Sequence, residues 1–278
     1  MGAGRAFDHV VLAVHDLAGA ARIYETLGFS LTPLAHHEDR MGTSNRIAQF
    51  QEQNFIELLE VDRPDTLAPH DFAVSPPFFS FGAHNRAALA EREGLSMLVF
   101  AGDDARADVA SFAAKGVPTY APFDFERQAR LPDGKSVTVA FSLAFATSPD
   151  LPNMAFFVCQ NRAPEYFWKP AFQSHENGAL GIRAIYLSSR DPDRDAAFIG
   201  KMFDGEITAV AGGQHVACGA QQEVRVLTPA TISELDPSFT MEDLDRPVLA
   251  GLAIACGEER QTTPAAAACG AFIEWVRR

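Results

Sequence analysis

The chain has 278 residues, of which 47% are hydrophobic and 21% charged, so it has the composition of an ordinary globular protein with room for two domains. Its formal net charge of −13 argues against nucleic acid and against an anionic membrane surface as partners, because each of these attracts basic patches. No apolar run is long enough to span a bilayer, and no signal peptide is evident. We therefore expect a cytoplasmic protein with reduced cysteines that acts on a small molecule.

The first predicted unit opens with an apolar strand at residues 7–14, and a helix follows from Asp16, which can cap it, to Gly28, which can end it. Three more strands are predicted in the segments FSLTPL, RIAQF and NFIELLEV. The unit therefore has the order strand, helix, strand, strand, strand.

The same order recurs further along the chain. A second copy begins at LSMLVFAGDD and continues through PTYAPFDFE, SVTVAFSLAFA and MAFFVCQ, with a hairpin turn predicted at residues 131–135. A third copy begins at GIRAIYLSSRDP and ends at EVRVLTP, and a shortened fourth copy is predicted from VLAGLAIAC and AFIEWVRR. The aspartate-to-glycine intervals 16–28, 104–116 and 193–205 share one spacing, which supports the repeat.

These repeats predict an α+β fold built from βαβββ modules. We expect an N-terminal pair of modules at residues 1–170 and a degenerate C-terminal pair at residues 178–278. Residues 161–180 break the periodicity, and their many aromatic side chains predict a connection that packs against the protein.

Two polar residues interrupt apolar strands of the first unit. His9 lies in FDHVVLA, and Glu57 lies in FIELL. Because alternate residues of a strand share one face, His9 is expected to lie on a face with Phe7 and Val11, and Glu57 on a face with Phe55 and Leu59. A buried carboxylate is costly unless it has a partner, so Glu57 is expected to contact a metal, His9 or Arg46.

The segments DHVVLAVHDL, GTSNRIAQF, FIELL, FFVCQ and PEYFW resemble the vicinal oxygen chelate superfamily, and more narrowly its glyoxalase-like domain proteins. The resemblance implies paired modules that form a cupped mixed sheet around a divalent metal, which chelates oxygens of the substrate. It also implies that His9 and Glu57 are metal ligands and catalytic residues. An imidazole with a carboxylate suits Zn, Mn, Ni, Co or Fe.

The second module departs from the pattern that the resemblance implies. Its ligand positions fall on Ser96 or Met97 and on Phe157, or on Gln160 if the register slips by some residues. Gln160 is therefore a candidate third ligand, and Phe157 a candidate contact of the substrate. The corresponding positions of the third and fourth modules fall on Ala184 or Tyr186, Arg225, Gly251 and Glu274.

Further candidates lie outside the apolar strands. Asn45 and Arg46 in GTSNR are candidate substrate-binding residues, with a plain turn as the alternative. His37 and His84 lie in predicted loops, where histidines are usually solvated.

Two functions are compatible with these residues. The first is a metal-dependent lyase or isomerase acting on a small oxygenated compound. An extradiol dioxygenase is less favoured, because it would require two histidines and a glutamate. The alternative is a metal-free protein that binds an aromatic or hydrophobic molecule in the cup. In either case the C-terminal pair is expected to be a scaffold or the surface of a homodimer.

Overall fold

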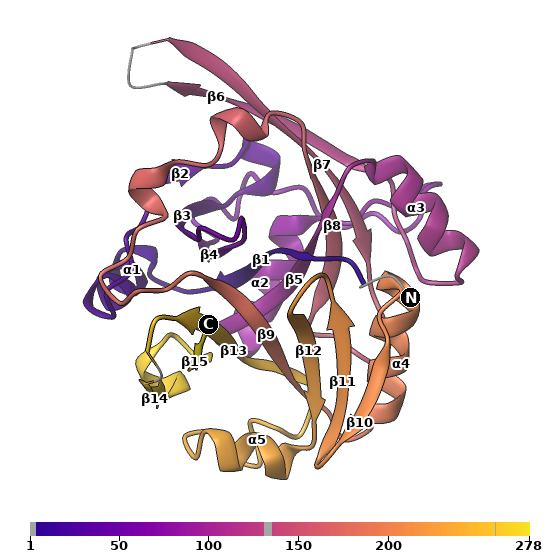
Figure 1. The fold of residues 1–278 in the computed structure, drawn as a ribbon. Helices are drawn as coiled ribbons and strands as arrows, with labels where there is room; N and C mark the ends of the chain where they lie inside the picture. Colours follow the sequence, from indigo (N-terminus) through magenta and orange to yellow (C-terminus); the bar gives the residue numbers. More distant parts are fainter. Residues whose placement is uncertain (1–3, 131–134, 259) are drawn as a thin grey trace.

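The computed structural model describes residues 4–130, 135–258 and 260–278, and within these ranges it contains five α-helices and fifteen strands that form one mixed sheet (Figure 1). The α+β fold of repeated modules is therefore confirmed. The hairpin turn predicted at residues 131–135 falls largely on residues outside the described ranges.

The first module has the predicted order of elements. They are β1 (Phe7–Ala13), α1 (Leu17–Thr26), β2 (Ala35–His36), β3 (Ser44–Gln49) and β4 (Phe55–Glu60). Strand β4 runs parallel to β1 and antiparallel to β3. Asp16 caps α1 as expected, because its Oδ1 accepts the Gly19 amide at 2.9 Å.

One strand of this module was predicted wrongly. The segment FSLTPL, at residues 29–34, is not a strand, and the short strand β2 follows it instead. Pro33 within the segment has no amide hydrogen to donate to a sheet, which accounts for the absence of a continuous ladder there.

The second module repeats the order and joins the first edge to edge. It consists of β5 (Gly94–Gly102), α3 (Ala105–Ala114), β6 (Phe123–Arg130), β7 (Ser136–Ala146) and β8 (Ala155–Asn161). Strand β5 pairs antiparallel with β1, so the two modules form one cup. Helix α2 (Phe81–Glu91) precedes β5 and is an addition to the predicted repeat.

The third and fourth modules form the C-terminal pair. The third consists of β9 (Gly181–Ser188), α4 (Pro192–Phe203), β10 (Ile207–Val210), β11 (Gly213–Cys218) and β12 (Gln222–Leu227). The fourth keeps β13 (Val248–Cys256), β14 (Arg260–Thr263) and β15 (Phe272–Arg277), and α5 (Pro229–Leu235) lies between the two modules. The cap of α4 is Asp191, two residues before the interval that begins at Asp193, because Pro192 takes the first helical position.

The two pairs of modules are in direct contact. Strands β5 and β13 pair at Leu95 and Leu249, which makes the sheet continuous. The ring of Phe203 on α4 stacks on that of Phe100 on β5 at 3.5 Å between centroids. The proposed division into two domains, at residues 1–170 and 178–278, stays a prediction, since the contacts between the pairs neither require nor exclude it.

The two cups differ in the side chains that fill them, and this difference indicates where a site can form. A cluster of buried residues that includes Val11, Met97, Val99 and Phe157 covers the concave face of this cup. The C-terminal cup is filled differently, because Ile232 of α5, Phe239 and Leu244 pack against its strands. The N-terminal cup is therefore the place to look for a functional site.

Candidate functional site

His9 and Glu57 lie side by side on the concave face of the N-terminal cup. The adjacent parallel strands β1 and β4 place His9 opposite Phe55 and Val11 opposite Glu57. Both polar residues are buried, at 5% and 4% exposure, and the His9 Nε2 atom lies 3.6 Å from Glu57 Oε2. The structure therefore brings the two strand residues singled out from the sequence into one hollow.

The orientation of His9 is fixed from its other side. Asp8 Oδ1 lies 2.5 Å from His9 Nδ1, and the ring stacks on Phe55 at 4.2 Å between centroids. Because an ionised carboxylate can only accept, the proton of the neutral imidazole sits on Nδ1. Nε2 is left with a lone pair that points at Glu57.

His37 also reaches Glu57, from the loop between β2 and β3. Its Nε2 lies 3.5 Å from Glu57 Oε1, and its Nδ1 contacts Thr43 Oγ1 at 2.8 Å. The side chain is 9% exposed, so the expectation of a solvated loop histidine was wrong. The sequence placed His37 in a loop, but no pattern in it indicated that this residue reaches the site.

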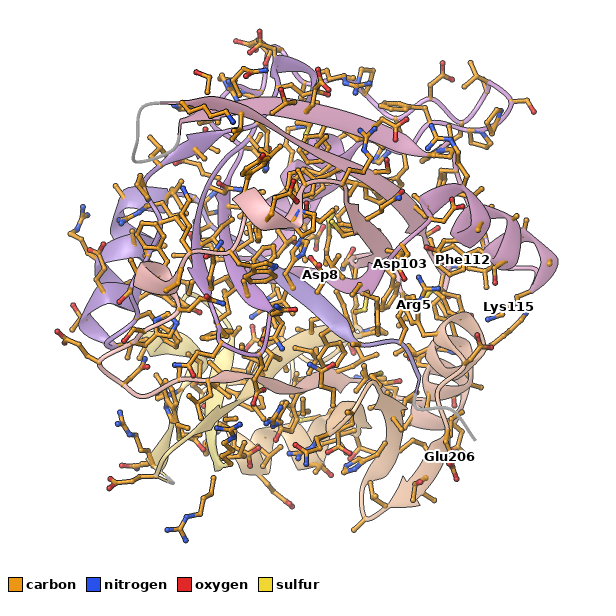
Figure 2. The ribbon with its side chains drawn as sticks, turned by 45° about the horizontal axis from the view of Figure 1, so that its top comes forward. Arg5, Asp8, Asp103, Phe112, Lys115 and Glu206 are labelled. Carbon is orange, nitrogen blue, oxygen red and sulfur yellow. The ribbon has the colours of Figure 1, made fainter. Side chains whose placement is uncertain are left out.

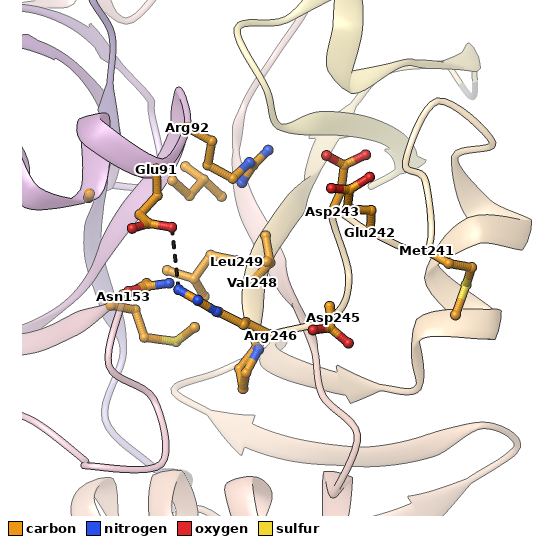
Figure 3. A pocket seen from close by; sticks show the side chains of 15 residues that line it. Glu91, Arg92, Asn153, Met241, Glu242, Asp243, Asp245, Arg246, Val248 and Leu249 are labelled. Carbon is orange, nitrogen blue, oxygen red and sulfur yellow. Dashed lines mark hydrogen bonds and ion pairs between the residues drawn. The ribbon is translucent and has the colours of Figure 1, made fainter.

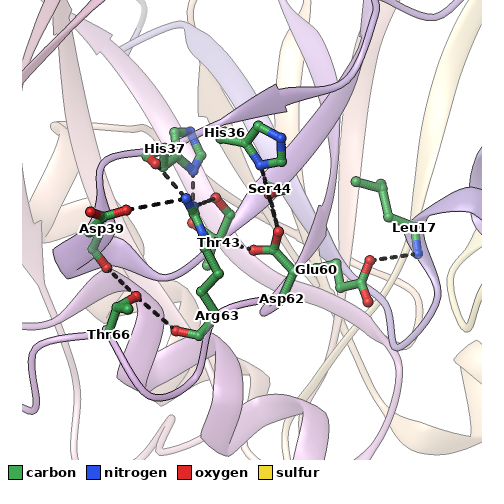
Figure 4. A network of polar contacts seen from close by, with 10 residues as sticks. All are labelled: Leu17, His36, His37, Asp39, Thr43, Ser44, Glu60, Asp62, Arg63 and Thr66. Atoms are coloured by element: carbon green, nitrogen blue, oxygen red, sulfur yellow. Dashed lines mark hydrogen bonds and ion pairs between the residues drawn. The ribbon is translucent and has the colours of Figure 1, made fainter.

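Arg63 holds the loop that carries His37 (Figure 4). One terminal nitrogen of its guanidinium donates to the carbonyls of His37, at 3.0 Å, and of Thr43, at 2.8 Å. Gly42 adopts a φ of 63°, and a Cβ there would lie 2.7 Å from the Arg63 carbonyl oxygen, so only glycine lets the loop pass so closely. The two ends of the loop are thus clamped together.

Asn45 of β3 completes the polar part of the site. Its Nδ2 donates to Glu57 Oε1 at 2.5 Å and lies 3.2 Å from His37 Nε2. Its Oδ1 is buried and has no hydrogen-bond partner among the described residues. A buried polar atom without a partner is costly, so this oxygen is available to a ligand.

Two of the candidate residues are not brought to the site. Arg46 follows Asn45 on the strand and points to the other face, where it pairs with Glu25 at 2.9 Å and donates to the Thr32 carbonyl at 2.8 Å. Gln160 accepts the Ala105 amide at 3.3 Å and donates to the Asp103 carbonyl at 2.5 Å. Figure 2 shows Asp103 close to Phe112 of helix α3. The expectation that Gln160 is a ligand therefore fails, because its side chain is engaged at the start of that helix.

The second module supplies an apolar wall. Val99 stands opposite His9 and Met97 opposite Val11, while Ser96 turns away and donates to Asn85 Oδ1 at 2.7 Å. Phe157 on β8 lies at the site, with its ring 5.5 Å from that of His9.

Cys159, on the same face of β8 as Phe157, is also buried at the wall. Burial raises the pKa of its thiol well above the usual value, and the nearby Asp8 and Glu57 carboxylates act in the same direction. Cys159 is therefore a neutral thiol in this environment rather than a nucleophile.

The hollow in front of these groups is small and aromatic. Its volume is about 50 Å³, far below the ~300–1,000 Å³ of a typical ligand pocket. Six phenylalanines line it, namely Phe55, Phe81, Phe125, Phe141, Phe157 and Phe167. A second cavity, of about 240 Å³, is lined in part by the same Asn45, Ile47 and Phe167, so these three side chains separate the hollow from a larger space.

A larger cavity lies elsewhere, between α2, the start of β5 and residues 241–249 (Figure 3). Its volume is about 680 Å³. Charged residues at its edge pair with each other or with residues outside the lining. Arg246 lies 3.3 Å from Glu91, and Asp245 pairs with Arg190. Size alone does not make it the candidate site, because its ion pairs lie in solvent and need no ligand.

The C-terminal cup contains a polar cluster at the corresponding place. Arg225 on β12 lies 3.0 Å from Glu274 on β15, and the hydroxyl of Tyr186 on β9 contacts both. Arg225 also pairs with Glu223 at 2.6 Å. An arginine paired with two acids and a tyrosine satisfies itself, so this cluster is read as structural.

The donor atoms in the N-terminal cup suit a divalent metal in part. Within the described residues, no group of three or more His, Cys, Asp or Glu side chains already stands in a metal-holding arrangement. However, two ligand atoms about 2.1 Å from a tetrahedral ion lie about 3.4 Å apart. The 3.6 Å and 3.5 Å separations of Glu57 from His9 and His37 are close to that value and too long for hydrogen bonds.

Comparison with known proteins places this fold. Residues 7–202 match the family described as "Glyoxalase-like domain". A crystal structure of a hypothetical protein from Staphylococcus aureus is similar over 98% of this chain and 99% of its own, with a TM-score of 0.71 at 14% identity. A mutant of 4-hydroxymandelate synthase from Streptomyces coelicolor is similar over 92% of this chain and 72% of its own, with a TM-score of 0.54 at 12% identity.

Both structural similarities concern the fold alone. A search of curated proteins gave no match. In the part of the chain that the structure describes, none of the helices combines the length and the apolar character needed to cross a bilayer.

Proposed function

Since the chain belongs to the glyoxalase-like domain family, we propose that it is a metal-dependent enzyme of the vicinal oxygen chelate type. Its substrate would be a small oxygenated organic compound, and it would act on this compound as a lyase or an isomerase. The observation that carries the proposal is the approach of His9 Nε2 to Glu57 Oε2, at 3.6 Å, in a buried hollow.

His9 and Glu57 are the residues that would hold the metal. When bound, a divalent ion polarises an oxygen of the substrate as a Lewis acid. Asp8 keeps the Nε2 lone pair of His9 directed into the hollow, and Asn45 holds the carboxylate of Glu57 through Oε1. The unpaired Oδ1 of Asn45 can accept a hydrogen bond from a hydroxyl of the substrate.

The surrounding residues set the conditions for chemistry. At a stage when it does not hold the ion, the carboxylate of Glu57 could accept a proton from a carbon of the substrate, which is the step that an isomerase or lyase needs. The wall formed by Phe55, Phe141 and Phe157 excludes water, so the charges at the site act in a medium of low polarity. A substrate larger than the hollow would have to displace Phe167 toward the neighbouring cavity.

The metal is tested directly. Protein purified without chelator is analysed for bound metal, and its melting temperature is measured with Mn²⁺, Co²⁺, Ni²⁺, Zn²⁺ and Fe²⁺ in turn. We expect one of these ions to raise the melting temperature of the wild type but not of Glu57→Gln. Glu60→Gln is the matched control, since Glu60 lies on the same strand but bonds the Leu17 amide outside the hollow. Stabilisation by none of the ions would contradict the proposal.

A second function is favoured by a specific observation. The module-two ligand positions that face the cup carry Met97 and Phe157, and the hollow is mostly aromatic, which suits a metal-free protein that binds a hydrophobic molecule. Stabilisation of Glu57→Gln by small aromatic compounds, without metal, would support this alternative. In both cases we propose that the C-terminal pair is a scaffold or a homodimer surface, since Ile232, Phe239 and Leu244 fill its cup.

A further inference from the structure

We propose that His37 is the third protein donor of the metal site, so that the first module alone supplies the complete set of His9, His37 and Glu57. The inference rests on the proposed function, because it requires a divalent ion at Glu57. It goes beyond that function because a residue from a loop of the first module, His37, takes the place of the ligands that the second module lacks.

The geometry around Glu57 supports this role. Its two carboxylate oxygens each face one imidazole, with Oε2 3.6 Å from His9 Nε2 and Oε1 3.5 Å from His37 Nε2. All three side chains are less than 10% exposed. Two imidazoles against one carboxylate, at separations too long for hydrogen bonds, are the donors that a transition metal prefers.

The adjacent histidine shows that the loop directs His37 specifically. His36 points outward, with a 57% exposed side chain that contacts Ser44 Oγ at 2.7 Å and Asp62 at 3.6 Å. His37 turns inward, and Arg63 fixes its carbonyl while Thr43 contacts its Nδ1 (Figure 4). If Thr43 accepts from Nδ1, the Nε2 lone pair faces the hollow, as it does in His9.

The contact that His37 now makes inside the hollow is one that an ion can replace. Its Nε2 lies 3.2 Å from Asn45 Nδ2, whose stronger bond, at 2.5 Å, goes to Glu57 Oε1. Exchanging the longer contact for a metal would leave the hydrogen bond between Asn45 and Glu57 in place. A small shift of the loop is needed, since the three side chains do not yet close around an ion.

The additional histidine changes which reactions deserve testing. An extradiol dioxygenase was less favoured from the sequence because only one histidine was placed beside the glutamate. Two histidines and one carboxylate are the donors found in non-haem Fe(II) oxygenases. Ferrous iron therefore belongs among the ions tested, together with those that suit a lyase or isomerase.

The test counts the imidazoles bound to an ion. Untagged protein is loaded with substoichiometric Cu²⁺, and electron spin echo envelope modulation detects the remote nitrogen of each coordinated imidazole. We expect two imidazoles in the wild type and in His36→Gln, but one in His37→Gln and one in His9→Gln. Calorimetry with Co²⁺ should show an affinity at least tenfold lower for His37→Gln and within twofold of wild type for His36→Gln. Circular dichroism of each metal-free variant checks that it folds.

The outcomes separate the two proposals. One imidazole in the wild type that persists in His37→Gln and is lost in His9→Gln would overturn the role of His37 while leaving the metal-dependent function intact. Failure of the wild type to bind either ion would overturn both. A Co²⁺ affinity of His37→Gln equal to that of the wild type would also count against His37.

Discussion

His9 and Glu57 face each other from adjacent parallel strands, and the 3.6 Å between Nε2 and Oε2 is too long for a hydrogen bond. On the other side of the ring, Asp8 lies 2.5 Å from Nδ1. Two oxygen acceptors thus flank one imidazole that has a single proton to share. The arrangement is explained if the proton of the neutral imidazole stays on Nδ1, where Asp8 accepts it in a hydrogen bond, and a cation takes the place between Nε2 and Glu57.

The first prediction concerns Asp8, which we assign as a positioning residue for His9. Asp8→Asn keeps the size of the side chain but can donate as well as accept, so it no longer forces the proton onto Nδ1. We expect Co²⁺ affinity to fall about 10–100-fold by calorimetry, the range typical of partners that orient a metal-binding histidine. Asp16→Asn is the control, because asparagine also caps helices and the charge change is the same. Equal affinities of wild type and Asp8→Asn would exclude the positioning role.

The second prediction concerns Arg63 and the loop that it clamps. Arg63→Met removes the hydrogen bonds to the carbonyls of His37 and Thr43. Because bonds from a charged donor contribute about 1.5–3 kcal/mol each, we expect the free energy of unfolding in urea to drop by roughly 3 kcal/mol. Arg22→Met, at an exposed arginine 3.9 Å from Asp16, should cost less than about 0.5 kcal/mol.

A local readout distinguishes the clamp from a general loss of stability. Amide hydrogen exchange of residues 37–43 should become faster in Arg63→Met, even under conditions where the rest of the sheet keeps its protection. If the loop exchanges at the wild-type rate, Arg63 does not hold it.

The third prediction concerns Phe167, which separates the hollow from the neighbouring cavity. Its ring packs against Phe55 at 5.3 Å and Phe141 at 5.9 Å between centroids. Phe167→Ala should join the two spaces and expose Cys159, which lines the hollow. We expect faster reaction of this thiol with the neutral reagent 4,4′-dithiodipyridine, at a cost of about 3 kcal/mol in stability.

The remaining cysteines require a control for that measurement. Cys159→Ser, with and without Phe167→Ala, reports the background reaction of the other thiols, of which Cys269 is partly exposed. An unchanged Cys159 rate in Phe167→Ala would show that this ring does not close the hollow.

The fold was readable from the sequence because its signals are local. Asp16 caps its helix as predicted, and Asp104, at the start of the matching interval, caps the next one, since a cap depends on residues within one turn. In the third module the interval begins at Asp193, but Asp191 is the cap because Pro192 takes the first helical position, which is again a local effect. Strand alternation placed His9 and Glu57 on the same face for the same reason.

The site was less predictable because it depends on contacts between distant residues. His37 reaches the hollow only because Arg63, 26 residues further on, holds its carbonyl, and no pattern near His37 indicates this. Gln160 was considered only under a slipped register, and the regular pairing of β8 leaves Phe157 and Cys159 facing the cup instead. Long-range hydrogen bonds and register are the information that one sequence does not display.

The fourth prediction concerns the pH dependence of stability through His84 of α2. Burial lowers the pKa of His84 to about 4, although its Nε2 hydrogen bond to the Ser96 carbonyl, at 3.2 Å, opposes the shift. In the unfolded chain the pKa is near 6.5. Between these two values the unfolded state binds a proton that the folded state does not, so stability is full above pH 6.5 and is lost as the pH falls toward 4.

His84→Gln isolates this contribution, because glutamine can donate to the Ser96 carbonyl but does not titrate. We expect wild type to lose about 2 kcal/mol more than the variant between pH 7 and pH 5, measured by urea unfolding at each pH. Burial also lowers the pKa of His70 and His175, so both proteins should retain some pH dependence, and the difference between them is the quantity that counts. Parallel curves for the two proteins would mean that His84 takes up a proton as readily in the folded chain as in the unfolded one.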